Sequence, residues 1–222
     1  MLLDPIVAAI RGLPLDAHER RAAAQLLRVQ AAGERIARDG ARAQAGIAPD
    51  RVSRRFLLRQ SRQESFHAVL FDRLARTLDS EDHVVREADI PASLARISTA
   101  LSEAIAGRNY ADAIVIQHVA LEGLGHAVLE RLDEELPAFG EYFGRLRGLI
   151  LAQEDAHYAF GARMLVIRRH EGHVIRLTRR MLDEAESLLI AIAPQFHALG
   201  GDVADVMEPL RRRALASAGA PC

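Results

Sequence analysis

The chain contains one short motif twice, and each copy places a histidine three residues after a glutamate. The copies are Gln63-Glu64-x-x-His67 and Gln153-Glu154-x-x-His157. Residues three apart lie on one face of a helix, with Cβ atoms about 5–6 Å apart, so each copy can direct an oxygen and a nitrogen at one metal ion. A single glutamate precedes each copy, Glu34 by 30 residues and Glu122 by 32 residues.

Together these side chains form a set of four carboxylates and two imidazoles: Glu34, Glu64, His67, Glu122, Glu154 and His157. Two Glu-x-x-His helices and two helices with one glutamate each are the pattern of two-metal centres in four-helix bundles. Carboxylate and imidazole ligands suit iron or manganese better than metals that prefer thiolates. The two motifs would supply terminal or chelating ligands. Glu34 and Glu122 would be the terminal and bridging carboxylates, in an order that the sequence leaves open.

The spacing of turn signals tests whether these residues can meet. We expect helices over 16–45 and 50–77, separated by the Gly46-Ile-Ala-Pro-Asp50 break. If the chain reverses near residue 48, Glu34 lies about 14 residues before the turn and Glu64 about 16 after it, at nearly one level along the bundle. Glu19, the other glutamate of the first helix, would lie about 20 Å away from that level. We therefore choose Glu34 over Glu19.

The second half of the chain repeats this arrangement. Helices are expected over 110–135 and 138–170, with a break at Pro137. Glu122 stands 15 residues before that proline and Glu154 stands 17 after it. Shorter or later helices are expected over 4–11, 91–106, 174–197 and 202–217. Segment 78–109 must connect the two hairpins as one long crossover.

These elements predict an all-α fold, a ferritin-like four-helix bundle with one long crossover plus extra C-terminal helices. The 222 residues would form a single domain, with a metal-binding core over about 16–170 and accessory helices over about 174–217. Half of the residues are hydrophobic and 5% are aromatic. β-Branched runs such as residues 114–116 occur inside helical periodicity, so strands are not expected.

Composition narrows the classes of function and location. All 29 basic side chains are arginine, yet the net charge is only -1, which argues against nucleic acid as a partner. The only cysteine, Cys222, leaves no disulfide within the chain. No stretch approaches the ~20 apolar residues of a membrane span, and the start lacks the apolar run of a signal peptide. We expect a cytoplasmic monomer or homodimer.

Over about residues 16–170 the chain resembles the ferritin-like di-iron carboxylate superfamily. Within it, the chain is most similar to small di-iron oxygenases such as the cyanobacterial aldehyde-deformylating oxygenases. Residues 154–165, Glu-Asp-Ala-His-Tyr-Ala-Phe-Gly-Ala-Arg-Met-Leu, resemble that family's Glu-x-x-His-x-x-Tyr-Gly-x-x-Trp-Leu, and Leu121-Glu122 resembles its Ile-Glu. Rubrerythrins have an extra carboxylate where this chain has Gly125. Ribonucleotide reductase small subunits have a radical tyrosine where it has Phe71.

The resemblance implies an oxidoreductase, an O2-activating non-haem di-iron oxygenase or oxidase that acts on a small, mostly apolar substrate. Its cofactors would be two Fe ions (Fe2+/Fe3+), or an Mn/Fe pair, with O2 as co-substrate. Electrons would come from an external ferredoxin or reductase, because the chain has no flavin, nicotinamide or iron–sulfur motif. Two alternatives stay open: an iron-handling protein of the ferroxidase or peroxidase type, and a tRNA-modifying di-iron hydroxylase.

Three residues near the ligands are candidate catalytic groups. His118 and His126 stand four residues on either side of Glu122 and could be an additional ligand or a proton donor. Tyr158 could be a redox or hydrogen-bonding partner. Each of the three could instead be a packed side chain without a chemical role.

Uncharged residues around the ligands suggest supporting roles. Gln63 and Gln153 each precede a motif glutamate, and a glutamine oxygen could accept the N–H of a ligand imidazole. Gly125 and Gly161 remove side-chain volume near the metal face. A mid-helix glycine costs about 1 kcal/mol relative to alanine, so open space or close helix packing would explain them.

Overall fold

The computed structural model describes residues 4–79, 90–135 and 140–220, and within these ranges the regular structure is helical throughout. The elements are α1 (Asp4–Arg11), α2 (Ala17–Gln44), α3 (Arg51–Leu78), α4 (Ala92–Ala106), α5 (Tyr110–Ile114), the π-helix η2 (Val115–Leu121), α6 (Glu122–Glu135), α7 (Gly140–Leu165), the 3-10 turn η4 (Val166–Arg168), α8 (Gly172–Ala198) and α9 (Val203–Ala218). The predicted all-α class is confirmed. None of the described helices is both long enough and apolar enough to cross a membrane.

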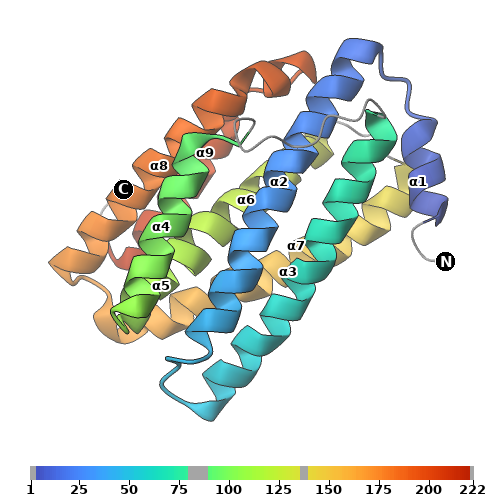
Figure 1. Ribbon diagram of the computed structural model, residues 1–222. Helices are drawn as coiled ribbons and strands as arrows, with labels where there is room; N and C mark the ends of the chain where they lie inside the picture. The colour runs from blue at the N-terminus through green and yellow to red at the C-terminus, as the bar shows by residue number, and fades with distance from the viewer. Residues whose placement is uncertain (1–3, 80–89, 136–139, 221–222) are drawn as a thin grey trace.

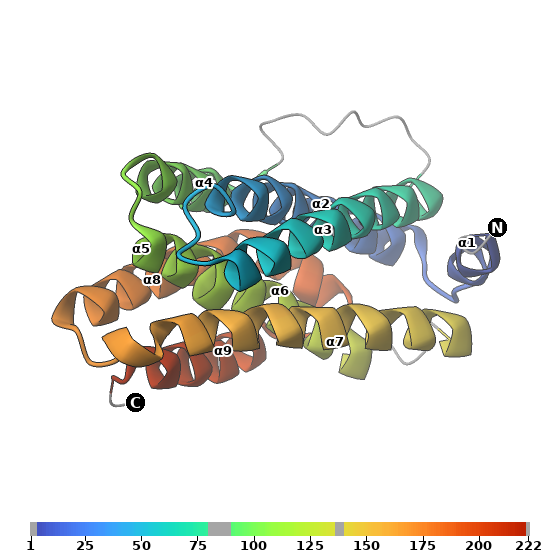
Figure 2. The same ribbon diagram turned by 90° about the horizontal axis from the view of Figure 1, so that it is seen from below.

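Two long hairpins form the centre of the molecule. Helices α2 and α3 lie side by side along their whole length, and the continuous rod of α5, η2 and α6 pairs with α7 (Figures 1 and 2). Helix α8 packs on α2, α4 and η2, while α9 packs on α6 and α8. Helices α8 and α9 thus cover one side of the core, and α3 lies on the opposite side of α2 from α8 (Figure 1).

The start of each helix of the first hairpin is fixed by an aspartate cap. Asp16 accepts hydrogen bonds from the backbone N–H groups of His18 and Glu19, and the Glu19 carboxylate accepts the Asp16 N–H at 2.7 Å. This reciprocal pair is a capping box, so Glu19 has a structural role far from the ligand level. Asp50 caps α3 in the same way through Val52 and Ser53. The predicted bounds of both helices are confirmed to within one residue.

The third core helix contains a π-helical segment that the sequence did not predict. The third core helix as a whole occupies 110–135 as expected. Within it, the Glu122 N–H donates to the carbonyl of Gln117, five residues earlier. A π turn carries one more residue than an α turn and often marks a functional site. It changes the direction of His118 relative to Glu122, so the four-residue spacing no longer reports a shared face.

The predicted end of the fourth core helix at residue 170 is wrong. Helix α7 ends at Leu165 and a 3-10 turn follows, after which His170 has a φ of 74°. The His170 N–H donates to the carbonyl of Ala218 at 3.0 Å, and its ring nitrogen pairs with the Gly219 carbonyl at 2.7 Å. These bonds to the end of α9 replace those of a continued helix. The expected break at Pro137 and start at residue 138 lie outside the described residues.

Candidate metal centre

The six sequence-predicted ligands converge in the interior of the bundle. Helix α2 supplies Glu34, α3 supplies Glu64 and His67, α6 supplies Glu122, and α7 supplies Glu154 and His157. Their exposed fractions do not exceed the 4% of Glu34. All six therefore lie where water has little access, and where an unpaired charge is costly.

The donor atoms fall into two overlapping groups. One consists of Glu34, Glu64, His67 and Glu154, and the other of Glu64, Glu122, Glu154 and His157. Within each group every residue offers one donor atom, and these atoms all lie within 4.8 Å of one another. Glu64 and Glu154 belong to both groups, whereas Glu34 and Glu122 belong to one each. The expectation that Glu34 or Glu122 bridges is therefore corrected: the motif glutamates are placed to bridge, and the single glutamates to be terminal.

Each motif histidine directs its Nδ1 atom at the carboxylates. His67 Nδ1 lies 3.0 Å from Glu64, 3.3 Å from Glu154 and 3.5 Å from Glu34. His157 Nδ1 lies 3.0 Å from Glu64 and 3.4 Å from Glu122. An ion in either group would therefore be held by Nδ1, which leaves Nε2 to carry the proton.

The glutamines that precede the motif glutamates hold these rings in a crossed arrangement. His67 Nε2 lies 2.8 Å from the side-chain oxygen of Gln153, and His157 Nε2 lies 3.0 Å from that of Gln63. Each glutamine thus accepts an N–H from the histidine of the other motif helix. The accepting role expected for these glutamines is present, and it fixes the ring orientation that points Nδ1 inward.

Glutamines also hold the two terminal carboxylates, which the sequence interpretation missed. Gln30 Nε2 donates to Glu34 Oε1 at 2.8 Å, and Gln60 Nε2 donates to Glu122 Oε1 at 2.6 Å. In both cases the other oxygen, Oε2, is the one that faces a histidine Nδ1. The sequence contained one signal for the Gln30 contact: Gln30 is four residues before Glu34, which puts both side chains on one helix face.

Gln117 supports Glu122 from the π-helix. Its Nε2 donates to the Ala37 carbonyl at 2.9 Å and lies 3.4 Å from Glu122 Oε1, while its own oxygen accepts from Gln44 at 2.6 Å. Gln44 and Gln117 are fully buried. The π segment therefore aligns Gln117 with both α2 and Glu122, a function that helical periodicity alone did not indicate.

His118 lies beside the ligands but belongs to neither group of donor atoms. Its Nε2 donates to Gln60 Oε1 at 2.9 Å, and complete burial lowers its pKa to about 3. The ring is therefore neutral and contacts Glu122 only through Gln60. Its Cβ explains Gly161: a Cβ added at Gly161 would lie 2.3 Å from it. Close helix packing thus accounts for this glycine.

The other two candidate catalytic residues point to α9. His126 Nε2 lies 3.3 Å from Asp155, and its Nδ1 lies 3.4 Å from Arg213. The Tyr158 hydroxyl donates to the Arg213 carbonyl at 2.8 Å and pairs with Ser217 at 2.7 Å. Because Tyr158 is one residue past His157, it is turned roughly 100° away around the helix. Neither side chain is part of a donor group.

The electrostatics of the cluster indicate a site built for cations. Burial raises the pKa of Glu34 to about 8 and raises that of Glu122, and the neighbouring carboxylates add to both shifts. Burial disfavours the charged form of His157, but its three carboxylate neighbours more than offset this and raise its pKa to about 12. Burial also disfavours the charged form of Glu154, but the attraction of its two histidine neighbours outweighs burial and lowers its pKa.

The unpartnered atoms test whether metal ions fit. Both oxygens of Glu64, Oε1 of Glu154 and both histidine Nδ1 atoms are buried without a hydrogen-bond partner among the described residues. Two divalent cations would neutralise the four carboxylates and give each of these atoms a partner. The residues present therefore fit a pair of divalent ions.

These pKa shifts predict that a rise in pH has opposite effects on the stability of the metal-free protein and on that of the metal-loaded protein. Glu34 and His157 keep their protons to higher pH in the folded state. The stabilisation of the metal-free protein by Glu34 is present below about pH 4.5 and is lost as pH rises towards about 8, and that by His157 is present below about pH 6.5 and is lost as pH rises towards about 12. Metal binding displaces those protons, and each displaced proton weakens the apparent affinity about tenfold per pH unit on acidification.

We therefore expect the rise in melting temperature on adding Fe2+ anaerobically to grow between pH 6 and pH 8. Calorimetry with and without metal at several pH values measures it. A metal-induced shift that stays constant or shrinks over this range would contradict the assignment.

The crossed hydrogen bonds predict a site-selective effect of Gln153→Leu. Removing the acceptor for His67 is expected to weaken the ion held by Glu34 and His67 about 10–100-fold, and to spare the other ion. Gln63→Leu is the matched variant and should weaken the His157 site instead. Anaerobic titration with Co2+, followed by its d–d absorption, resolves the two events. Equal titrations for wild type and both variants would refute the role of these glutamines.

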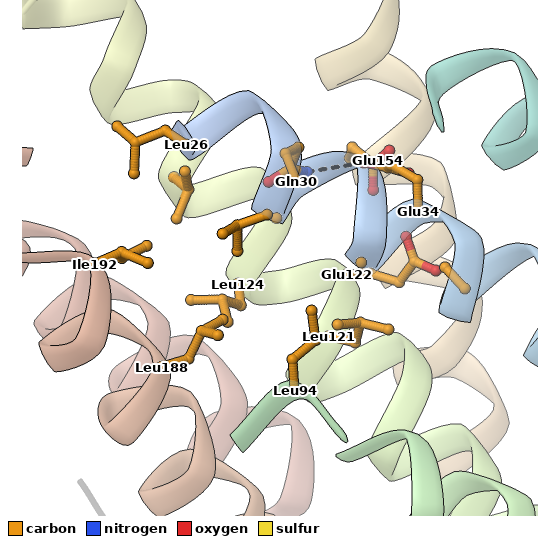
Figure 3. Close-up of a pocket in the computed structure, with 15 residues that line it drawn as sticks. Leu26, Gln30, Glu34, Leu94, Leu121, Glu122, Leu124, Glu154, Leu188 and Ile192 are labelled. Atoms are coloured by element: carbon orange, nitrogen blue, oxygen red, sulfur yellow. Dashed lines mark hydrogen bonds between the residues drawn. The ribbon is translucent and has the colours of Figure 1, made fainter. Parts of the chain in front are cut away.

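An apolar cavity reaches the ligands from the side of α8. We name it the leucine-lined cavity; its walls come from α2, α4, η2, α6 and α8 and include Leu26, Leu94, Leu121, Leu124, Leu188 and Ile192, with Glu34, Glu122 and Glu154 at one end (Figure 3). Among the residues that the structure describes, Gln30 is its only other polar wall residue. Its volume is about 40 Å³, room for a few water-sized molecules. Gly125 also lines it, and a Cβ there would lie 3.2 Å from Gln30 Nε2, so close packing against Gln30 accounts for that glycine.

Comparisons with known proteins support the fold. The chain matches a solved structure described as protein 19 with aldehyde deformylating oxidase activity from Synechococcus, with a TM-score of 0.75 and 23% identity over 93% of this chain and 95% of that one. At this identity the match establishes the fold, and the predicted ferritin-like bundle is confirmed. No protein-family model matches the chain, and no curated protein sequence matches it.

Proposed function

We propose that the protein is an O2-activating non-haem di-iron oxygenase or oxidase with a small, mostly apolar substrate. The observation that supports this most strongly is the leucine-lined cavity, because its inner end is formed by Glu34, Glu122 and Glu154. A substrate in that cavity would lie against the open side of the ligand set. Bound and reduced, a pair of iron ions supplies electrons to O2.

The roles of the protein residues follow from their positions. Glu64 and Glu154 would hold both ions, while Glu34 with His67 and Glu122 with His157 would complete one ion each. The hydrogen bonds from Gln30 and Gln60 occupy Oε1 of each terminal carboxylate. Each of these carboxylates would then offer its ion a single oxygen, Oε2. The apolar walls would exclude water from the reaction.

The same cavity argues against the two alternatives. An iron-handling protein needs a route for hydrated Fe2+, and leucine walls do not attract a hydrated cation. A tRNA hydroxylase needs polar groups to bind a nucleotide base, which walls of leucine and isoleucine do not provide. A larger substrate than O2 requires some of the leucine side chains to move, and these walls favour an alkyl chain over a polar group.

Anaerobic iron loading followed by exposure to O2 tests the proposal. We expect two Fe2+ per chain, and O2 consumption that accelerates when medium-chain or long-chain aldehydes, alcohols or amines are added with a chemical reductant. Mass spectrometry with 18O2 identifies the product. Oxidation of many Fe2+ per chain with formation of ferric oxide, independent of any organic compound, would assign the protein to iron handling instead.

A further inference from the structure

Helix α3 presents an exposed row of cationic and apolar side chains along its outer face. Its members are Arg51, Arg55, Arg59, Arg62, Phe66 and Val69, which we call the α3 stripe. They follow each other at intervals of three or four residues, so they form one continuous row on the helix. All are exposed, Phe66 by 45% and Val69 by 58%. The helix thus carries metal ligands on its inner face and this row on its outer face.

The charge of the stripe is unbalanced locally. Residues 51–62 contain five arginines and no acidic residue, although the whole chain has a net charge of -1. None of Arg51, Arg55 and Arg62 forms an ion pair with any residue that the structure describes, and Arg59 lies over the Phe56 ring at 5.2 Å. Arginine and aromatic side chains are enriched at protein interfaces. Cations around an apolar centre suit an acidic protein surface.

The stripe is also close to the metal centre. Phe66 precedes the ligand His67 in the chain, and their ring centroids are 6.3 Å apart. A partner on this face would be separated from the ions by the thickness of one helix, about 10 Å. The walls of the leucine-lined cavity come from other elements, and no residue of α3 contributes to them. Figure 1 shows α3 across α2 from α8.

We propose that the α3 stripe is the docking surface for an acidic one-electron carrier protein that reduces the metal centre. The proposal rests on the proposed function, which requires electrons from outside the chain. An electron donor needs proximity to the ions and no access to the substrate cavity, and the stripe offers that combination. A nucleic acid bound here as substrate would lie on the wrong side of the ligands. A second copy of the chain would bring like charges together.

Charge reversal tests the docking surface. The probe is a plant-type [2Fe–2S] ferredoxin, which is acidic, and the readout is its stopped-flow reduction of the iron-loaded ferric protein. R55E/R62E is expected to lower the bimolecular rate at low ionic strength at least ~10-fold and to flatten its salt dependence. R55Q/R62Q should have a smaller effect of the same sign. Phe66→Ala should lower the rate with the salt dependence kept.

The control is R176E/R180E on α8, which makes the same change in net charge at two exposed arginines. It should keep the wild-type rate to within about twofold. Iron content and reduction by dithionite with a small mediator should be equal in all variants, because neither requires docking. The proposal is overturned if the rate of reduction by ferredoxin falls equally in the stripe and control variants, or if it falls in neither.

Two further outcomes separate this proposal from the proposed function. If the mediator cannot reduce the wild-type centre, the proposed function fails. If the mediator works but the ferredoxin does not reduce the wild type, only the docking proposal is overturned. Transfer RNA that binds at low salt, and is lost in R55E/R62E while ferredoxin reduction is unchanged, would assign the stripe to nucleic acid and overturn the docking proposal.

Discussion

Replacement of Glu64 by alanine is expected to reduce the iron content from two ions per chain to essentially none. Glu64 is shared by both donor groups, and its two oxygens are buried without hydrogen-bond partners among the described residues. Its loss therefore takes a ligand from each ion and leaves the remaining charges unbalanced. Glu154→Ala should act in the same way, because Glu154 is the other shared carboxylate. Metal analysis after anaerobic loading measures the effect.

Variants of the terminal carboxylates provide a graded comparison. Glu34→Ala and Glu122→Ala should each weaken one ion and retain the other, because each residue belongs to one donor group. His126→Ala is the control and should retain two ions. Two tightly bound ions in Glu64→Ala would contradict the bridging assignment.

Gly161→Ala is expected to lower the melting temperature by up to about 8 °C. The new Cβ would lie 2.3 Å from His118 Cβ, and because both atoms are attached directly to backbone, α7 and η2 must separate. Such overpacking costs about 1–3 kcal/mol or more, against a gain of about 1 kcal/mol in helix propensity. One kcal/mol corresponds to roughly 2–4 °C for a domain of this size. The displacement should also lower iron affinity, because it moves Glu122 away from Glu154.

Gly148→Ala is the matched control on the same helix. A Cβ at Gly148 would meet no described atom within 4 Å, so only the propensity gain remains and the melting temperature should rise by roughly 2–4 °C. Thermal unfolding followed by circular dichroism compares the two variants. Shifts of the same sign at both glycines would show that helix propensity, and not the contact with His118, decides the effect.

The ligands could be predicted from sequence because their constraint is local. Two Glu-x-x-His motifs determine a helix face each, and the level of Glu34 and Glu122 follows from the distance to the nearest turn. The starts of α2 and α3 could be predicted for the same reason. Asp16 and Asp50 cap these helices, and a cap depends on residues only two or three positions away.

The supporting residues depend on contacts between helices, and there the sequence interpretation was incomplete. His118 and Glu122 are four apart, which indicates one face in an α-helix, but the π segment between them removes that relation. The partners of Gln30, Gln60 and Gln117 are carboxylates and backbone carbonyls that sequence spacing did not assign. The early end of α7 depends on bonds from His170 to the end of α9, about fifty residues away.

The central claim is that two metal ions lie between α2, α3, α6 and α7. X-ray diffraction from crystals loaded anaerobically with Fe2+, recorded on both sides of the iron absorption edge, tests it most directly. We expect two anomalous peaks per chain, one among Glu34, Glu64, His67 and Glu154 and the other among Glu64, Glu122, Glu154 and His157. A single peak, or iron bound only at surface carboxylates while these six side chains hold none, would contradict the account.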